Sequence, residues 1–464
     1  MAEATNKDAE RRALMLETPI HKLVPKMAVP TVVAMVVTAI YNMADTYFVS
    51  FLGTSAQAAV GVNLSIDQFI MMAGSMLAIG ANSYIARLLG AKKNERADNT
   101  LSTAFFTAFA IGVAFAVFGL IYLRPMVEFL GASETAMEYS EQYARYVLYA
   151  APFMATSFVL NQCLRSEGSA FYSMVGMGLG AVLNIGLDPI FIFTLDMGVA
   201  GASIATAISK LVGFVILIIP YARRRTVVRL SFRLIKFAKD IVKEVTLMGL
   251  PSFFRTGLSI VCLILLNRRA REFSDAVQAG ISVVGRIMMI PSFAVLGFGQ
   301  GFMPVAGYNW GAKRFDRVKQ AFRFSQISSL VFAAVFCGTI IVFAEPIIRL
   351  FSKVDEEMLA VGKFCLITQC ALMPANAWVI IVNMMHSAIG RPAGAIVLGI
   401  SRQGICFIPM FYILPVLFGV FGLAATQAAA DVFAALIAVP FAVNVLRYVN
   451  RTAKRELRPP EKGA

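Results

Sequence analysis

Long apolar stretches separated by short polar segments run through nearly the whole chain of 464 residues. Many of them exceed about 20 residues, the length at which a helix crosses a hydrocarbon core of about 30 Å. Because no water reaches that core, a spanning backbone must satisfy its hydrogen bonds internally, as a helix or as a closed barrel. The stretches are too long and too continuous for barrel strands, which alternate over about ten residues. The pattern therefore predicts an all-α polytopic membrane protein.

Twelve of the apolar stretches are predicted to be transmembrane helices. An even number of spans places both termini on one side, together with most of the 42 Lys and Arg residues, including loop residues such as Lys92 and Arg165. The positive-inside rule predicts that this side is cytoplasmic. A basic group at Arg268, Arg269 and Arg271 lies on the opposite side and does not follow the rule. The predicted spans cover residues 23–52, 60–90, 96–123, 133–164, 170–195, 198–222, 244–271, 277–310, 316–344, 356–387, 391–417 and 420–447.

The composition narrows the function classes. Hydrophobic residues make up 58% of the chain and charged residues 15%, with a formal net charge of +15. Because the basic residues lie in loops between apolar spans, this charge indicates membrane orientation, and we expect no nucleic-acid partner. The six cysteines lie in or beside apolar stretches without the spacing of a metal site, so we interpret them as core residues. The sequence has no phosphate-binding glycine-rich loop and no catalytic constellation, so we predict neither an enzyme nor a bound cofactor.

The two halves of the chain resemble each other at a constant offset of 221 residues. One offset relates four separated segments, which indicates a duplication. Each half holds six spans, so both halves insert in the same orientation, and a pseudo-two-fold axis along the membrane normal relates two six-helix lobes. The predicted lobes are 1–222 and 244–464, joined by a basic linker at 223–243, and such a pair suits alternating access. The matched segments are Val29-Pro30-Thr31 with Leu250-Pro251-Ser252, Gly90-Ala91-Lys92-Lys93 with Gly311-Ala312-Lys313-Arg314, Arg124-Pro125 with Glu345-Pro346, and Gly198-Val199-Ala200-Gly201 with Gly419-Val420-Phe421-Gly422.

Four polar residues of the first half lie at a similar depth within the predicted spans. Asp45, Asp188 and Thr206 are each about seven or eight residues from the outer end of a span, on the order of 10 Å below the membrane edge. Asn184 precedes Asp188 by four residues and shares its helix face. A buried charge costs about 2.5–3.5 kcal/mol on insertion scales, so such residues are functional candidates. Two acids in a dry site can exchange a proton or hold a small cation such as sodium; the alternative is a network that only locks three helices together.

Further polar residues lie beside this cluster. Tyr41 and Asn42 flank Asp45, and Lys210 lies about one turn deeper than Thr206. We expect Lys210 either to favour the charged form of Asp188 or to compete with the cation for the site. The alternative is that it only forms a structural ion pair.

The second half does not repeat the two acids, because Leu266 and Pro409 occupy the positions equivalent to Asp45 and Asp188. It instead carries Arg255, Arg286 and Arg402 well inside its predicted spans, with Asp431 as its one clear acid there.

Several sequence runs resemble the multidrug and toxic compound extrusion family, over nearly the whole chain. The combination of an Asn-x-x-x-Asp-Pro run with a following Gly-Ala-x-Ile-Ala-Thr run is fairly specific. The pattern is most similar to the bacterial branch with the DinF-like and MepA-like exporters. The runs are Tyr41-Asn42-Met43-Ala44-Asp45-Thr46, Leu89-Gly90-Ala91, Leu164-Arg165-Ser166-Glu167-Gly168, Asn184-Ile185-Gly186-Leu187-Asp188-Pro189 and Gly201-Ala202-Ser203-Ile204-Ala205-Thr206.

The resemblance implies twelve helices in two lobes and antiport of drug-like, mostly cationic compounds against protons or sodium. It also implies a monomer in the bacterial inner membrane. The cation site of the family falls on Asp45, Asn184, Asp188 and Thr206. Some members use acids in the seventh and tenth spans; this chain has Arg255 and His386 as its notable polar residues there. We therefore leave an anionic or zwitterionic substrate open.

Two other functions compete with a drug exporter. A flippase for lipids or polysaccharide precursors of the same superfamily would also use a basic central cavity, which the arginines of the second half could provide. A receptor or scaffold that transports nothing would leave the paired acids without a purpose.

Overall fold

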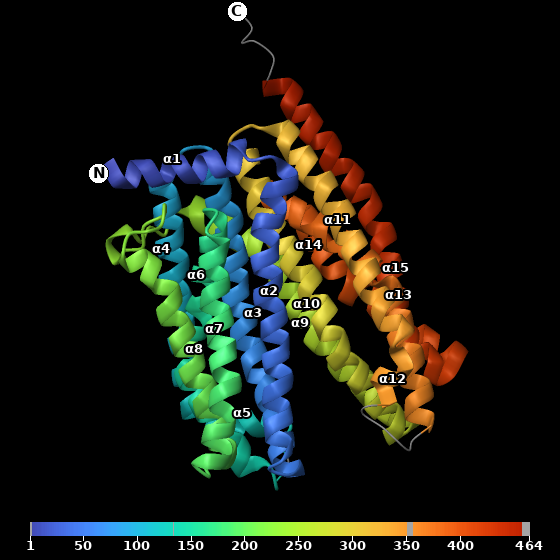
Figure 1. Ribbon diagram of the computed structural model, residues 1–464. Helices are drawn as coiled ribbons and strands as arrows, with labels where there is room; N and C mark the ends of the chain where they lie inside the picture. Colours follow the sequence, from blue (N-terminus) through green and yellow to red (C-terminus); the bar gives the residue numbers. More distant parts are fainter. Residues whose placement is uncertain (1, 133, 350–355, 457–464) are drawn as a thin grey trace, which may run out of the picture.

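The computed structural model describes residues 2–132, 134–349 and 356–456. In these residues the chain is helical almost throughout and has no strand, which confirms the predicted all-α class (Figure 1). The helices of the first half are α1 (Ala2–Glu17), α2 (Ile20–Ser50), α3 (Thr54–Gly90), α4 (Asn94–Ile121), α5 (Leu123–Phe129), α6 (Met137–Ser166), α7 (Ala170–Pro189), η1 (Ile190–Thr194) and α8 (Gly198–Ala222).

The second half follows the same plan after a short helical turn in the linker. Its elements are η2 (Phe232–Leu234), α9 (Lys239–Phe273), α10 (Asp275–Gly311), α11 (Phe315–Val342), α12 (Ala344–Arg349), α13 (Glu356–Ala388), α14 (Pro392–Ile400), η3 (Ser401–Cys406) and α15 (Phe407–Glu456).

Eleven helical segments of the described chain are long and apolar enough to cross a membrane. The last of them, Pro392–Glu456, is 65 residues long. Its backbone breaks at Gly419, with φ 57° and ψ −134°, a conformation that glycine adopts far more readily than other residues. This break lies between the predicted spans 391–417 and 420–447, so the segment contains two passes, and the chain doubles back there toward the C-terminus (Figure 1).

Left-handed backbone positions repeat at the offset of the duplication. Lys92 and Lys313 follow α3 and α10, with φ of 61° and 57°. Gly198 starts α8 and Gly419 starts the returning part of α15, with φ of 55° and 57°. Because positive φ is uncommon for any residue except glycine, its recurrence at both pairs supports a duplicated backbone.

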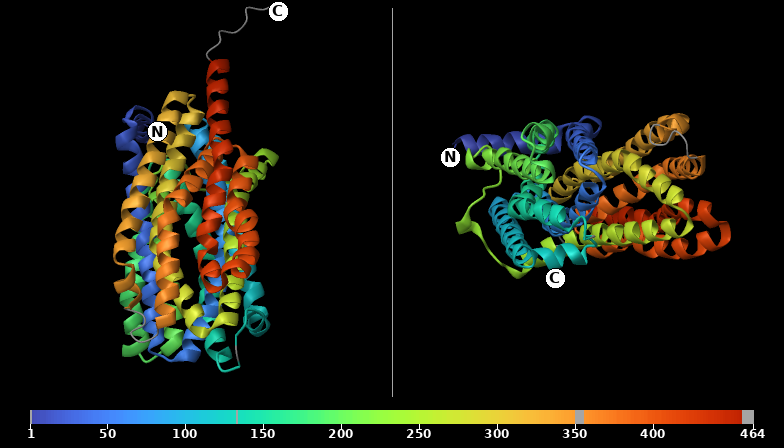
Figure 2. Two further views of the ribbon diagram at one scale, coloured as in Figure 1. Left: turned by 90° about the vertical axis from the view of Figure 1, so that its right-hand side faces the viewer. Right: turned by 90° about the horizontal axis from the view of Figure 1, so that it is seen from below.

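The helices form two bundles, α2–α8 and α9–α15, which lie side by side (Figures 1 and 2). In the first bundle α6 packs against α3, α4 and α8, and in the second α13 packs against α10, α11 and α15. Across the interface, α2 packs on α10 and α3 packs on α9. The bundles approach each other at the end that carries the termini and diverge toward α5 and α12 (Figure 1).

Close backbone contact and polar pairs join the bundles at the end with the termini. A Cβ atom built on Gly80 would lie only 1.9 Å from a backbone oxygen of α9, so α3 and α9 approach this closely because the residue is glycine. Arg87 Nη2 bonds to Glu244 Oε2 at 2.7 Å. The Ser83 hydroxyl donates to the carbonyl oxygen of Ser387 at 2.5 Å. These contacts link helices of different bundles, so they must separate if this end opens.

Arg165 was predicted to lie in a cytoplasmic loop, and the structure corrects this prediction. The residue belongs to the last turn of α6 and is fully buried. Its Nε donates to Ser173 Oγ at 2.8 Å, and its Nη1 donates to Gln300 Oε1 of α10 at 2.5 Å. The helix continues past the predicted end of its span, and the guanidinium group therefore lies in the interface between the bundles.

The polar segments outside the spans are ordered against the first bundle. Helix α1 lies across the end of the bundle (Figure 1), and Arg11 Nη1 donates to the Gly168 carbonyl oxygen at 3.2 Å. The linker runs beside α4, where the backbone N–H of Arg229 donates to Asp98 Oδ1 at 2.8 Å. Residues 239–243, predicted as linker, are helical because α9 already begins at Lys239.

Candidate cation and substrate sites

Asn184 joins two of the other residues predicted for the cation site. Its Nδ2 atom donates to Asp188 Oδ1 and to Thr206 Oγ1, both at 3.2 Å. Asn184 and Asp188 share one face of α7 because they are four residues apart, and Thr206 comes from the neighbouring α8. All three side chains are buried. Three of the four predicted residues are thus in direct contact.

Asp45, the fourth predicted residue, reaches the cluster from α2 through a tyrosine. The Tyr143 hydroxyl of α6 donates to Asp45 Oδ2 at 3.5 Å and also lies within hydrogen-bonding reach of Thr206. The carboxyl groups of Asp45 and Asp188 are close enough for their charges to interact. The cluster therefore connects α2, α6, α7 and α8.

Two residues of this cluster were not predicted. Asp67 of α3 is half-buried and interacts electrostatically with Asp45 and Lys210. Asp67 is an acid within the predicted span 60–90, so its position in the sequence could by itself have identified it as a candidate. Tyr143 carries no comparable signal, because tyrosines are common in membrane helices near the interfaces. Only the packing of the bundle brings its hydroxyl to Asp45.

Lys210 lies beside Tyr41, with its Nζ atom 4.8 Å from the centre of the ring. Its positive charge interacts with Asp67 and Asp45. The structure therefore places Lys210 among the acids of α2 and α3, whereas its position in the sequence had suggested an effect on Asp188. Asn42 is half-buried, and its backbone carbonyl accepts a hydrogen bond from Thr46 Oγ1 at 3.0 Å.

The cluster contains buried oxygen atoms without a hydrogen-bond partner among the described residues. They are Asp45 Oδ1, Asp67 Oδ1, Asn184 Oδ1 and Asp188 Oδ2. Buried polar atoms are nearly always paired, so these oxygens suit a proton or a small hard cation, which prefers oxygen ligands. Within the described residues, no three His, Cys, Asp or Glu side chains converge as a metal site. A sodium ion here would therefore need the neutral oxygens of Asn184 and Thr206 as ligands.

The second bundle holds an ion pair whose carboxylate is buried, and a further arginine lies close to it. Arg402 Nε donates to Asp431 Oδ1 at 2.5 Å, and its Nη2 donates to Oδ2 at 3.3 Å. Arg255 Nη2 donates to Ser252 Oγ at 3.4 Å, and its charge interacts with that of Arg402. Ser252 Oγ in turn donates to Ser75 Oγ of the first bundle at 3.3 Å. Arg255 thus lies about one helical turn from a contact between the bundles.

Two other polar residues of the second bundle, Arg286 and His386, lie apart from this group of charged residues. Arg286 was predicted within a span, and the structure leaves it exposed on α10. It lies 11 residues, or about three helical turns, from Gly297, which packs against α2. Arg286 therefore lies on the side of α10 that faces the first bundle. His386 is buried, and its Nδ1 atom lies 2.9 Å from the Val382 carbonyl oxygen.

Two bundles of membrane-spanning helices, with buried carboxyl oxygens in the first of them that lack a partner among the described residues, define the architecture of a membrane transporter. A family model described as MatE matches residues 30–190 and 250–413, one match in each bundle. The chain therefore belongs to the MatE family, the multidrug and toxic compound extrusion transporters, as its sequence motifs predicted. Members of this family are not enzymes.

Relatives and solved structures match the chain over almost its whole length. It is 28% identical to the multidrug export protein MepA of Staphylococcus haemolyticus (strain JCSC1435), over 93% of this chain and 95% of the relative. An outward-facing multidrug resistance MATE transporter of the MOP superfamily has a TM-score of 0.89 at 26% identity, covering 94% of this chain and 98% of that structure. A MOP superfamily transporter from Pyrococcus furiosus Vc1, described as having a binding pocket of reverse polarity, has a TM-score of 0.88 at 26% identity, covering 95% and 98%.

Proposed function

We propose that the protein is a secondary active exporter that moves amphipathic organic compounds out of the cell in exchange for protons or sodium ions. The observation that carries this proposal is the buried cluster around Asp45, Asn184, Asp188 and Thr206, with its unpaired carboxyl oxygens. The names of relatives such as MepA support an organic compound as the exported substrate. We further propose that the protein acts as a monomer in the bacterial inner membrane.

Helix α2 connects the cluster mechanically to the interface between the bundles. It carries Asp45, and its inner part packs against α10, where Gly297 approaches Val32 and Gly301 approaches Ala28. It also packs against α7, the helix of Asp188. A cation bound between α2 and α7 would remove the repulsion between the two acids, and the preferred packing of α2 would change. Because α2 belongs to both contacts, the bound cation can bias which end of the transporter is closed.

The proposed orientation places both termini in the cytoplasm. Helix α1, the linker between the bundles and the C-terminal part of α15 lie at the end where the bundles meet (Figure 1). Basic residues gather at this end, as the positive-inside rule requires of cytoplasmic loops. In this orientation the described state is closed toward the cytoplasm and opens outward, so it corresponds to the stage at which substrate leaves and the cation enters.

Transport in proteoliposomes tests the coupling. A cationic dye such as ethidium is loaded, and a pH or a sodium gradient is imposed separately. We expect one of the gradients to drive dye movement, and Asp45→Asn and Asp188→Asn to reduce it to near background, because the amides cannot bind the driving cation as carboxylates do. Asp196→Asn removes an exposed loop acid and is the matched control, with activity expected to be unchanged. Full gradient-driven activity of both site variants would refute the cation site.

A specific observation favours a second substrate class, an anionic or zwitterionic compound. Arg255 and Arg402 lie close together, and of the two only Arg402 has a carboxylate partner, Asp431, among the described residues. A substrate carboxylate or phosphate could therefore bind Arg255 without competing with a protein acid. The transporter from Pyrococcus furiosus with a pocket of reverse polarity supports such a variation on this fold.

Substrate competition distinguishes the two classes. If an acid group binds Arg255, amphipathic carboxylates will inhibit dye transport by the native protein, and Arg255→Gln will weaken that inhibition. Inhibition by organic cations should be unchanged in the same variant. Equal inhibition of native protein and variant by the carboxylates would exclude Arg255 as their binding residue.

A further inference from the structure

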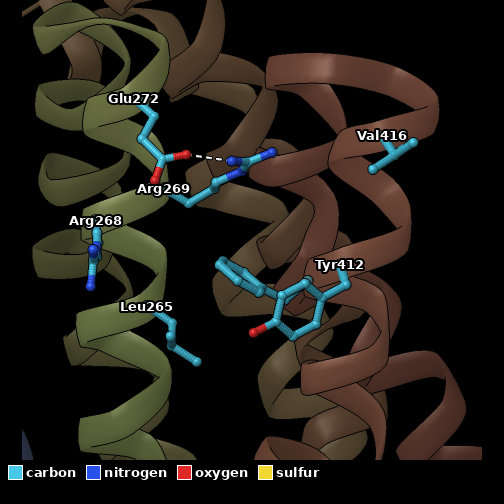
Figure 3. Close-up of a pocket in the computed structure, with 7 residues that line it drawn as sticks. Leu265, Arg268, Arg269, Glu272, Tyr412 and Val416 are labelled. Carbon is cyan, nitrogen blue, oxygen red and sulfur yellow. Dashed lines mark hydrogen bonds and ion pairs between the residues drawn. The ribbon is translucent and has the colours of Figure 1, made fainter.

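A pocket in the second bundle lies apart from the cation and substrate sites proposed above. This pocket, of about 350 Å³, opens between α9 and the first part of α15 (Figure 3). Its lining residues on α9 lie in the last turns of that helix, which ends at Phe273. Arg269 extends from α9 toward α15, and the ring of Tyr412 extends toward α9 from the other side (Figure 3). The pocket is lined by Leu265, Arg268, Arg269, Glu272, Tyr412 and Val416, among others.

The charges of the pocket do not cancel. Arg269 forms an ion pair with Glu272, and both side chains are about half exposed. Among the described residues Arg268 has no carboxylate partner, so the lining carries one net positive charge. These arginines belong to the basic group that departs from the positive-inside rule, and a local binding role would account for their position.

The exposed side of α9 is apolar in the two turns that precede Arg268. Val261 and Ile264 precede Arg268 by seven and four residues, so the three side chains share one helix face, and the two apolar ones are 47% and 61% exposed. One side of α9 is covered by its own bundle, where Cys262 Sγ donates to the Gln403 carbonyl oxygen of η3, and the first part of the helix packs on α3. Seen from below, α9 lies at the edge of the molecule (Figure 2), and we place the exposed apolar face of Val261 and Ile264 against the membrane.

The α15 wall of the pocket continues the apolar surface. Tyr412 and Val416 are 63% and 78% exposed, and Leu265 faces them from α9. Tyrosine and arginine together are typical of the depth at which lipid headgroups lie. The pocket thus combines an arginine without a partner near the end of the helix with an apolar wall that extends toward the middle of the membrane.

We propose that this pocket binds an anionic phospholipid of the surrounding membrane, with its phosphodiester group on Arg268 and an acyl chain along Leu265 and Tyr412. A guanidinium group matches the geometry of phosphate oxygens, with two parallel N–H donors. The net charge of the lining complements the single negative charge of a phosphodiester. Bound lipid would also fill the gap between α9 and α15, the two helices that form the walls of the pocket.

Native mass spectrometry of the purified protein with phosphatidylglycerol or phosphatidylcholine of identical acyl chains tests this proposal. We expect preferential retention of phosphatidylglycerol, weakened about fivefold by Arg268→Gln, in line with the contribution of one basic residue near a membrane surface. Arg271→Gln is the matched control, because it removes the same charge at nearly the same depth outside the pocket lining. Equal loss in both variants, or equal retention of the two lipids, would overturn the proposal.

A second variant separates the acyl chain from the headgroup. Leu265→Trp fills the apolar wall without changing any charge, and we expect it to weaken retention of phosphatidylglycerol as well. A phosphatidylglycerol with a photoreactive group on its acyl chain should label peptides that contain Leu265 or Tyr412. If inorganic phosphate displaces the lipid at similar concentrations, or if labelling is spread evenly over the exposed helices, the pocket is not a phospholipid site.

Discussion

Glu167 is a buried carboxyl group that holds the linker between the bundles against the first bundle. Its Oε2 atom accepts hydrogen bonds from the backbone N–H groups of Val227 and Val228, at 2.8 and 3.2 Å. Ser169 Oγ donates to the other oxygen at 3.0 Å. Burial raises the pKa of Glu167 to about 7, against the lowering effect of these donors.

The raised pKa of Glu167 predicts a pH dependence of stability. Between about pH 4.5 and 7 the folded protein holds this proton while the unfolded chain has lost it, so stability falls as the pH rises through that range and then levels off. We expect thermal unfolding in detergent to show this fall, and Glu167→Gln, which has no proton to lose, to flatten it. Glu167→Ala removes the acceptor and is expected to cost about 1–3 kcal/mol. A Gln variant with the native pH profile would contradict this assignment.

Pairs of helices at the closed end are held by equivalent residues of the two halves. Arg96 near the start of α4 forms an ion pair with Asp240 in the first turn of α9. Arg317, which occupies the same place in α11, donates to the Thr18 carbonyl oxygen just before α2 at 2.6 Å. Each arginine thus holds the start of the first transmembrane helix of the other bundle. The duplication therefore supplies matching contacts on both sides of the interface.

The reversal of the chain at Gly419 predicts an intolerance to side chains at this position. Gly419→Ala forces a Cβ atom into a backbone conformation that it disfavours, and we expect a loss of about 1–3 kcal/mol of stability. Gly338→Ala is the control, since nothing lies within 4 Å of a Cβ atom built there and its φ is ordinary for a helix. We expect that variant to be neutral or more stable by up to about 1 kcal/mol. Thermal unfolding followed by circular dichroism compares the two, and equal effects would contradict the argument.

The whole molecule is two bundles in contact at one end, so transport by alternating access requires that end to separate. The Ser75 and Ser252 hydroxyl oxygens, 3.3 Å apart on α3 and α9, lie across this contact. A covalent bond there would hold the described state in place. All six native cysteines are buried, as predicted from the sequence, so introduced thiols can be addressed selectively.

Oxidation of the Ser75→Cys/Ser252→Cys variant is expected to stop transport, and reduction to restore it, because the bundles can no longer part at the closed end. The control pair, Ser102→Cys with Ser231→Cys, joins the linker to α4 beside it and is expected to leave transport intact; the backbone N–H of Ser231 lies 3.2 Å from Ser102 Oγ. Each single variant is assayed alongside. Undiminished transport by the oxidised Ser75/Ser252 pair, with the cross-link confirmed on a gel, would refute separation at this end.

Hydropathy and spacing alone predicted the all-α class, the repeated half and the shared helix face of Asn184 and Asp188. These features are properties of single helices, since apolar length determines whether a segment spans the membrane and a spacing of four residues determines a shared face. The depth argument also brought Thr206 to the same level as Asp188, and the two side chains meet at Asn184.

The direction in which each helix turns its side chains was decided only by tertiary packing. Tyr143 and Asp67 join the cluster because α6 and α3 face α2 in the folded bundle, and Lys210 lies beside Tyr41 for the same reason. Arg165, which appears in the sequence as a loop charge, is buried against Gln300 of the other bundle. Sequence determines how deep a residue lies in its helix, whereas its neighbours depend on helix rotation and on the approach of the bundles, which contacts distant in the chain establish.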